Sequence, residues 1–282
     1  MEIIATAKEM QRRSEQLRLE GKKIAFVPTM GYLHKGHLTL MHEGKKRGDV
    51  LIVSIFVNPT QFGPGEDYER YPRDMKRDLA LLKGVGVDIC FTPPSQDMYP
   101  DGFQTCVEVE QVTKNLCGTS RPGHFRGVTT VVAKLFNIVK PHLAIFGEKD
   151  YQQLIAIKQM ARDLNMDIEV IGIPTIRESD GLAMSSRNTY LTAKERKEAL
   201  SLYRSLLKGK ELFLQGQRSA AKILTEITGI IKEQKSATID YVKICDVHTL
   251  EDIEEIKGEA IIALAVKIGK TRLLDNIILK EE

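Results

Sequence analysis

Two histidines, His34 and His37, lie three positions apart in the stretch PTMGYLHKGHLTLMHEG. An apolar run ends at Pro28, and the pattern predicts a helix from about Gly36. Side chains three apart at a helix start project to the same side, and a helix N-terminus attracts anions. We therefore expect the two imidazoles to offer hydrogen bonds or positive charge to a phosphate, with Gly31 and Gly36 letting the backbone come close.

Three other interpretations of this stretch were weighed. The Gly31-x-x-x-x-Gly36 spacing resembles a P-loop, but His37-Leu38 follows where Lys-Ser/Thr would be needed. A catalytic zinc site needs a third ligand, and no neighbouring Cys, His or Asp is evidently spaced to supply one. A pair of ordinary surface histidines remains an alternative.

Lys149 lies in FGEKDYQQL, directly after a predicted strand, His142–Phe146, and at the start of the next predicted helix. In a doubly wound sheet this position is at the carboxyl edge, where ligands bind. A cation at a helix N-terminus is locally unfavourable, so we expect an anion to compensate Lys149. An ordinary helix cap would explain the flanking Glu148 and Asp150 as well.

Asn58 and Gln61 lie in SIFVNPTQFGPGE, just past another buried run and at the same expected edge. Amide side chains both donate and accept hydrogen bonds, so they can recognise a small polar substrate. The Gly63-Pro64-Gly65 segment is typical of a loop that can move over a site. A simple polar turn would also account for either amide.

A fourth polar stretch, Ala183-Met184-Ser185-Ser186-Arg187, follows RESDGL. Two hydroxyls and a guanidinium on a glycine-containing loop can close on a polyphosphate. Taken alone, the stretch would also fit a polar turn between domains.

The elements that must position these residues alternate between strands and helices over the first two-thirds of the chain. The strongest helical stripe is Val128–Val139. Continuous apolar runs predict strands buried on both faces. This alternation predicts an α/β fold with a Rossmann-like, doubly wound parallel sheet. The predicted strands are Lys23–Pro28, Val50–Val57, Val87–Thr92, His142–Phe146 and Asp167–Ile171.

The pattern changes after Pro174. Residues 192–233 predict two amphipathic helices broken near Gly216, and three β-rich runs follow. Gly269-Lys270 is a plausible hairpin turn between the last two runs. We therefore expect a Rossmann-like domain over residues 1–175 and a smaller C-terminal α+β domain over residues 176–282.

Composition narrows the class of protein. The 282 residues are 42% hydrophobic and 28% charged, with a formal net charge of +3. Nothing here favours a nucleic-acid or membrane partner, and no apolar run approaches the roughly 20 residues that cross a bilayer. The cysteines, at 90, 106, 117 and 245, lack CxxC spacing, and the charged N-terminus lacks a signal-peptide core. We expect free thiols and a cytoplasmic location.

HxGH after the first strand resembles the signature of the nucleotidylyl-transferase superfamily, which includes class I aminoacyl-tRNA synthetases. Residues 183–187 look like the mobile Met-Ser-Lys-Ser loop of those enzymes. Ala183 and Ser186 stand where that loop has lysines, so another residue must supply the cation, and Lys149 is the candidate. PTMGYLHKGH, FVNPTQF, FGEKDYQQ and GLAMSSRN, with LCGTSRPGHFRGV between, together resemble the pantothenate synthetase (pantoate–β-alanine ligase) family along most of the chain.

The resemblance implies an activity. In that family, ATP and pantoate form pantoyl adenylate and pyrophosphate, and β-alanine then displaces AMP to give pantothenate. It also implies Mg²⁺ carried by ATP, a homodimer, and a smaller domain that closes over the ATP site. The small-molecule partners would be pantoate, β-alanine and ATP.

The resemblance also implies roles for residues. His37 would be the proton donor, and His34, Lys149, Ser185, Ser186 and Arg187 would be the other catalytic groups. Gln61 would hold pantoate and β-alanine, and Gln153 would hold pantoate. Asn58, whose amide we interpret above as able to recognise a polar substrate, is a further substrate-binding candidate. Arg121 and His124, in RPGHF, match a stretch whose role we leave open. The ATP contacts would be Met30, Gly31, Tyr32, Leu33, His34, Lys35, Gly36, His37, Gly147, Glu148, Lys149, Asp150, Ile176, Met184, Ser185, Ser186 and Arg187.

Two rival functions follow from the same motifs. One is another adenylyl or cytidylyl transferase, including an aminoacyl-tRNA synthetase, although the small C-terminal domain and near-neutral charge argue against a tRNA-binding face. The other is a non-catalytic nucleotide sensor. A sensor would need the ATP loop but would have no use for Gln61 and Gln153.

Overall fold

The computed structural model describes residues 1–281, which form two compact units. The first unit contains Met1–Val109, Arg121–Glu148 and Gln153–Pro174. The second begins its main part at Thr175 and also takes in Glu110–Ser120 and Lys149–Gln152. Because we expected the first domain to extend to residue 175, we expected Glu110–Ser120 and Lys149–Gln152 to belong to it.

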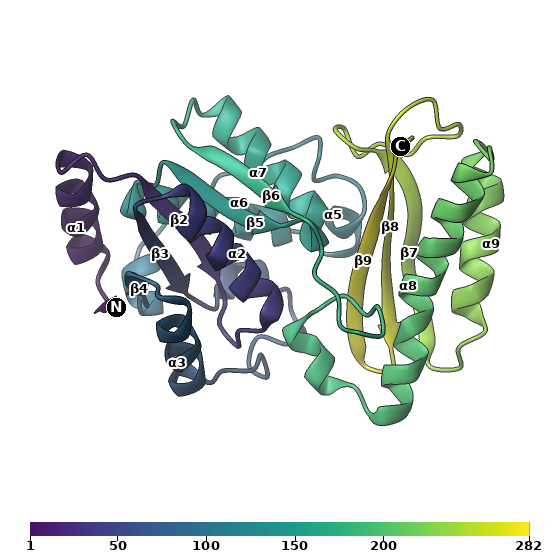
Figure 1. Ribbon diagram of the computed structural model, residues 1–282, viewed down its shortest axis with the longest axis horizontal. Coiled ribbons are helices and arrows are strands. Elements are labelled where there is room, and N and C mark those ends of the chain that lie inside the picture. Colours follow the sequence, from purple (N-terminus) through teal and green to yellow (C-terminus); the bar gives the residue numbers. More distant parts are fainter. Residues whose placement is uncertain (282) are drawn as a thin grey trace. The chain divides into compact units, whose positions relative to one another are not determined.

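The first unit is built on a parallel sheet of six strands in the order β1-β4-β3-β2-β5-β6 (Figure 1). The chain runs outward from β2 through β3 and β4, and then resumes on the other side of β2 with β5 and β6. This confirms the doubly wound parallel sheet. In such sheets ligands bind beyond the carboxyl ends of the strands where the order reverses, here β2 and β5. The strands are β1 (Glu2–Ile4), β2 (Ile24–Thr29), β3 (Val50–Ile55), β4 (Ile89–Phe91), β5 (Leu143–Gly147) and β6 (Glu169–Ile173).

Helices cover both faces of this sheet. Alternate residues of β2 point to opposite faces, so Phe26 packs with Val128 and Phe136 in one core, while Val27 packs with Leu40 in the other. The unbroken apolar runs of β2 and β3 arise because both sides of these central strands are buried. The helices are α1 (Ala7–Leu19), α2 (Lys35–Arg47), α3 (Met75–Val85), α4 (Ser95–Met98), α6 (His124–Val139) and α7 (Tyr151–Asp163), with 3-10 turns η1 (Pro59–Gln61) and η2 (Glu148–Asp150).

Each predicted strand of the first unit lies within two residues of its expected bounds, and one further strand is present. Residues Glu2–Ile4 form the edge strand β1, paired with β4, which the sequence did not predict. Its alternation is too short to recognise, because only Ile4 of its three residues is buried. The last strand was expected at Asp167–Ile171 and lies two residues later, at Glu169–Ile173.

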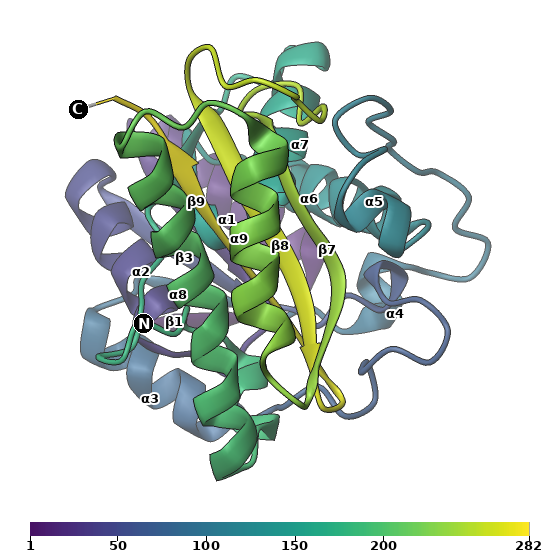
Figure 2. The same cartoon turned by 90° about the vertical axis from the view of Figure 1, so that its right-hand side faces the viewer.

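The second unit has an antiparallel sheet of three strands in the order β7-β8-β9. Helices α8 and α9 lie side by side over one face of it (Figure 2). Residues 269 and 270 form the predicted hairpin turn, and Gly269 adopts φ 59°, which suits glycine. The elements are α5 (Cys117–Ser120), η3 (Ser186–Tyr190), α8 (Ala193–Leu214), α9 (Ala220–Lys232), β7 (Ala237–Asp246), β8 (Ala260–Ile268) and β9 (Thr271–Leu279).

Side-chain clamps explain why residues 110–120 group with the second unit. The buried Gln152 amide donates to the carbonyls of Val112 and Asn115, at 3.0 and 2.7 Å, and accepts from Cys117 N at 3.0 Å. Asn115 in turn accepts a hydrogen bond from Lys243 Nζ at 2.7 Å on β7. Sequence spacing gives no sign of these contacts, because they join segments that are distant along the chain.

Among residues 1–281, no helix is both long and apolar enough to cross a bilayer. All four cysteines are free thiols, and only Cys106 is exposed. Burial raises the pKa of Cys90 to about 12 and that of Cys245 to about 12, so neither forms a thiolate at neutral pH.

We predict that Ellman's reagent will modify one thiol per native chain quickly and four after unfolding. The reason is that the thiolate is the reactive form and only Cys106 meets the reagent in water. A Cys106→Ser variant is the control and should lose the fast phase. Two or more fast thiols in the native protein would contradict the described burial.

Candidate active site

The HxGH loop connects the end of β2 with the start of α2. His34 is the N-cap residue of α2, and the ring centroids of His34 and His37 lie 4.0 Å apart, as the spacing predicted. The His34 backbone N–H donates to Nδ1 of His37 at 3.3 Å. A backbone N–H can only donate, so Nδ1 must accept, and neutral His37 carries its ring proton on Nε2. The Nε2–H group is therefore the side that can donate to a ligand.

Asp78, on α3, anchors the same loop through hydrogen bonds to its backbone. This carboxylate is buried and accepts from the backbone N–H groups of Tyr32 at 2.7 Å and Leu33 at 2.8 Å. Gly31 has φ 80°, and a Cβ there would meet Ile55 Cγ2 at 2.9 Å and Asp78 Oδ2 at 3.0 Å. Asp78 thus takes up the backbone N–H groups of Tyr32 and Leu33 and fixes the shape of the loop.

Replacing Asp78 with alanine should lower the free energy of unfolding by about 3 kcal/mol, because two loop N–H groups would lose a charged, buried acceptor. Urea unfolding monitored by circular dichroism would measure it. Asp74 is a matched control on the same helix, since it caps α3 by accepting from Arg77 N at 3.0 Å near the surface. Asp74→Ala should lower the free energy of unfolding by only about 1 kcal/mol. Equal costs for the two variants would contradict the clamp.

Gln61 and Asn58 form a hydrogen-bonded pair at the end of β3. The Asn58 side chain is buried, and its Nδ2 donates to Gln61 Oε1 and to Gly127 O, each at 3.1 Å. Its Oδ1 accepts from the Tyr99 hydroxyl at 2.7 Å. Gln61 Nε2 is thereby directed toward Met30 Sδ, 3.1 Å away. These contacts suit Asn58 to orienting the Gln61 amide rather than to touching a substrate itself.

Arg121 and His124 hold the backbone of the same glutamine. Arg121 donates to Gln61 O at 3.2 Å, and its Nη1 lies 3.0 Å from Nε2 of His124. Arginine only donates, so His124 Nε2 accepts, and His124 Nδ1–H then donates to Gln61 O at 2.8 Å. The sequence left these two residues without a role, and the structure makes them supports of Gln61.

Glu66 completes this group by forming a two-point ion pair with Arg121. Its carboxylate accepts from Arg121 Nε at 2.7 Å and Nη2 at 2.6 Å, and from Gly63 N at 3.1 Å. Burial opposes ionisation of Glu66, but Arg121 and the Gly63 N–H outweigh it, and the pKa of Glu66 lies below its ordinary value. The pair ties the Gly63-Pro64-Gly65 segment to the start of α6.

This lowered pKa predicts a pH dependence of stability. A carboxylate with a depressed folded-state pKa stabilises the fold above its unfolded pKa of about 4.3 and loses that contribution as pH falls through the folded value. Glu66→Gln should therefore flatten the fall of the urea midpoint as pH drops from about 5 toward 3. Glu69→Gln, at an exposed position of the same loop, is the control. Identical pH profiles for wild type and Glu66→Gln would contradict the ion pair.

In the second unit, residues Ile176–Met184 double back on themselves before the Ser185–Arg187 segment. Met184 N donates to Ile176 O at 3.0 Å, and Arg177 bridges to Ala183. Ser185 caps the following 3-10 turn, η3, by accepting from Arg187 N at 3.3 Å. The loop expected to meet polyphosphate is thus a structured hairpin and turn.

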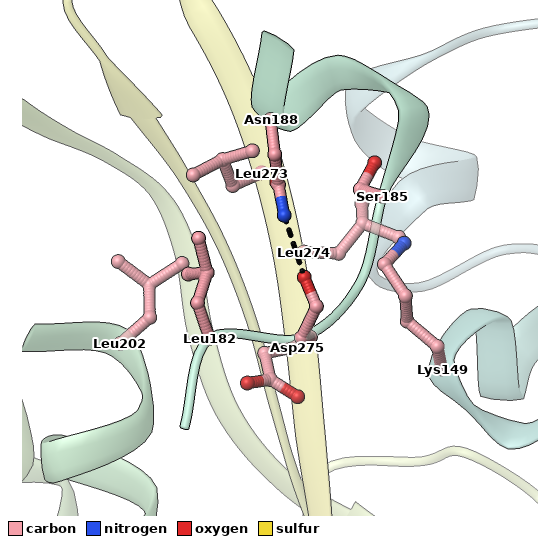
Figure 3. Close-up of a pocket in the computed structure, with 9 residues that line it drawn as sticks. Lys149, Leu182, Ser185, Asn188, Leu202, Leu273, Leu274 and Asp275 are labelled. Carbon is pink, nitrogen blue, oxygen red and sulfur yellow. Dashed lines mark hydrogen bonds between the residues drawn. The ribbon is translucent and has the colours of Figure 1, made fainter. Parts of the chain in front are cut away.

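Lys149 lies against this hairpin within the second unit. A pocket there is lined by Lys149, Ser185, Asn188 and Asp275 among its polar residues (Figure 3). The Asn188 side chain donates to the carbonyl of Ala183 at 3.1 Å. Lys149 Nζ lies 3.6 Å from Asp150 Oδ1. The carboxylate of Asp150 therefore balances part of the positive charge of Lys149, which we expected a bound anion to balance. Lys149 and Ser185 are nevertheless brought together, as the motif pairing predicted.

Several supporting residues were missed from the sequence. Asp78 and Arg177 lie inside ordinary charged stretches, where neither type nor spacing distinguishes them. Asp275-Asn276 did give a signal, because this polar pair interrupts an apolar strand, TRLLDNIIL. Gln153, which the sequence assigned to pantoate, lies in the first turn of α7.

Residues 2–278 match the protein family described as pantoate-beta-alanine ligase. The pantothenate synthetase of Syntrophus aciditrophicus is 59% identical over 282 residues, which are 100% of this chain and 99% of that protein. The chain belongs to this family. The relative from Geobacter sulfurreducens is 57% identical, with both chains covered in full. The family resemblance and the ligase assignment are confirmed.

Solved structures agree with this. The crystal structure of pantothenate synthetase from Thermus thermophilus is 45% identical, covers 100% of both chains and has a TM-score of 0.94. That of pantoate-beta-alanine ligase from Francisella tularensis, complexed with beta-gamma ATP and beta-alanine, is 37% identical, covers 99% of this chain and 97% of that chain, and has a TM-score of 0.81. The assignment of the chain as an enzyme therefore rests on sequence and on fold together.

Proposed function

We propose that this chain condenses pantoate with β-alanine, using ATP, to give pantothenate, AMP and pyrophosphate through a pantoyl-adenylate intermediate. The observation that carries the proposal is the family match along residues 2–278. The solved relative from Francisella tularensis, complexed with beta-gamma ATP and beta-alanine, supports it. The HxGH loop and the Ser185–Arg187 segment supply the side chains that an ATP-dependent activation needs.

The first step activates the acid. A carboxylate oxygen of pantoate attacks the α-phosphorus of ATP, a P–O bond forms, and the bond to pyrophosphate breaks. Negative charge grows on the phosphates, so stabilisation by fixed positive groups and donors should dominate. We assign this to Nε2–H of His37, to Lys149 and to Arg187, with His34, Ser185 and Ser186 as further donors.

The remaining ATP contacts are carried over from the family motifs as part of the same proposal. Backbone and side chains of Met30–His37, Gly147–Asp150, Ile176 and Met184 would hold the nucleotide. The position of the first two of these at the ends of β2 and β5, where the strand order reverses, supports the assignment.

The second step forms the amide. The neutral amine of β-alanine attacks the activated carbonyl, the C–O bond to AMP breaks, and the nitrogen loses a proton. Gln61 would bind both pantoate and β-alanine, and Gln153 would bind pantoate. The contacts of Gln61 support this assignment, because Asn58 orients its side-chain amide while Arg121 and His124 hold its backbone carbonyl before any substrate arrives.

Mg²⁺ fits the scheme as a companion of the nucleotide. Within residues 1–281 no group of three or more His, Cys, Asp or Glu side chains could hold a metal ion. Mg²⁺ commonly keeps several waters and binds through substrate phosphates, where it would share the polyphosphate charge. The proposal also includes a homodimer, which the family resemblance implies, and a cytoplasmic location, which the free thiols favour.

The test is pyrophosphate exchange followed by AMP release. With ATP and Mg²⁺, pantoate alone should drive labelled pyrophosphate into ATP, and AMP should accumulate once β-alanine is added. His37→Ala and Lys149→Ala should each lower the exchange rate by about 100-fold or more, because each removes a group stabilising charge in the transition state. His42→Ala, one turn further along α2, is the matched control and should remain close to wild type.

The outcomes separate the rival functions. ATP binding without AMP formation would favour a nucleotide sensor, and exchange driven by an amino acid instead of pantoate would favour a synthetase. AMP formation that needs β-alanine, with no exchange beforehand, would reject the adenylate route. Near-normal exchange in His37→Ala or Lys149→Ala would reject the role given to that residue.

A further inference from the structure

Strand β9 carries a buried polar pair, Asp275-Asn276, with exposed fractions of 3% and 8%. Asp275 forms a two-point ion pair with Arg177, whose Nη1 and Nη2 lie 2.6 and 2.9 Å from its carboxylate oxygens. Planar, two-point pairs of this kind fix orientation as well as charge. A buried pair contributes little net stability on average, so its value is more often in specifying one arrangement.

Arg177, held by Asp275, in turn contacts several parts of the Ile176–Met184 hairpin. Its guanidinium also donates to Gly181 O at 3.1 Å, its carbon Cζ lies 4.1 Å from the centre of the Tyr203 ring, and its backbone bridges to Ala183. Arg177 therefore joins the base, the tip and the far side of the Ile176–Met184 hairpin to β9. The Ser185–Arg187 segment begins directly after this hairpin.

Asn276 makes a second connection from the next position of β9. Its Nδ2 donates to the backbone carbonyl of Lys149 at 2.9 Å. That carbonyl belongs to the 3-10 turn η2, just before α7, so the contact fixes the backbone from which the lysine side chain extends. Two adjacent residues of one strand thus hold the hairpin and the lysine.

We propose that Asp275 and Asn276 are positioning residues that set Lys149 and the Ser185–Arg187 segment in a fixed relation to each other. Both held groups line one pocket together with Asp275 (Figure 3). The inference rests on the proposed function, in which Lys149 and the Ser185–Arg187 segment act on ATP. It adds that β9, which touches no substrate in that scheme, determines how effectively these groups stabilise the transition state.

The test compares Asp275→Asn with Asp240→Asn. Asp240 is the control, because its Oδ2 accepts from both Nε and Nη2 of Arg272, at 2.9 and 2.6 Å, in a more exposed aspartate–arginine pair between β7 and β9. Asp275→Asn should lower kcat of pyrophosphate exchange by about tenfold or more, since small misplacements of charge-stabilising groups are costly. KM for pantoate should change by less than about twofold, and Asp240→Asn should leave both constants near wild type.

Limited trypsin digestion gives a readout that does not depend on activity. Cleavage after Arg187, followed by mass spectrometry, should be about tenfold faster in Asp275→Asn, because its hairpin is released. It should be unchanged in Asp240→Asn. Asn276→Ala should lower exchange while leaving cleavage after Arg187 near wild type, because it frees only Lys149. This variant also decides the question if Asp275→Asn fails to fold.

The exchange and digestion experiments distinguish failure of the inference from failure of the proposed function. If wild type shows no exchange, the proposed function fails, while the digestion still reports whether Asp275 holds the hairpin. If wild type is active, exchange and digestion near wild type in Asp275→Asn would overturn the inference. It would equally be overturned if Asp240→Asn reproduced the kinetic loss at a similar melting temperature, or if Asn276→Ala left exchange unchanged.

Discussion

The pairing of β2 with β5 is the constraint on which the first unit's chemistry depends. These strands are neighbours in the sheet although more than one hundred residues of chain separate them, and the strand order reverses between them. The loops that leave their carboxyl ends diverge to opposite faces of the sheet, which opens room there for a ligand. The HxGH loop follows β2, and Glu148 follows Gly147, the last residue of β5.

Buried polar groups then hold the loops that this topology leaves exposed. Asp78 accepts from backbone N–H groups of the HxGH loop. Asn58 holds the side-chain amide of Gln61, and Arg121 and His124 hold its backbone carbonyl. In the second unit, Asp275 plays the corresponding part for Arg177. A loop that is held this way loses little further entropy when it binds a substrate, which is how a fold prepares side chains for catalysis.

The motifs carried the family assignment, and the family comparisons confirmed it over nearly the whole chain. The roles given to His37, Lys149 and Arg187 remain proposals with direct kinetic tests. The structure adds chemical detail to one of them, because the backbone of His34 selects the tautomer of His37 that can donate through Nε2.

The sequence by itself determined the doubly wound sheet, the two helices and three strands of the second unit, and the residue types that could meet a nucleotide, because hydrophobic period and short motifs are local properties. It did not reveal the edge strand β1, the clamp of Gln152 on residues 110–120, or the partners of Asp78 and Asp275. These depend on contacts between residues far apart in the chain. The type of a charged residue does not reveal whether its side chain faces water or an arginine in the folded protein. Only the tertiary structure decides which carboxylates are solvated and which hold a loop in place.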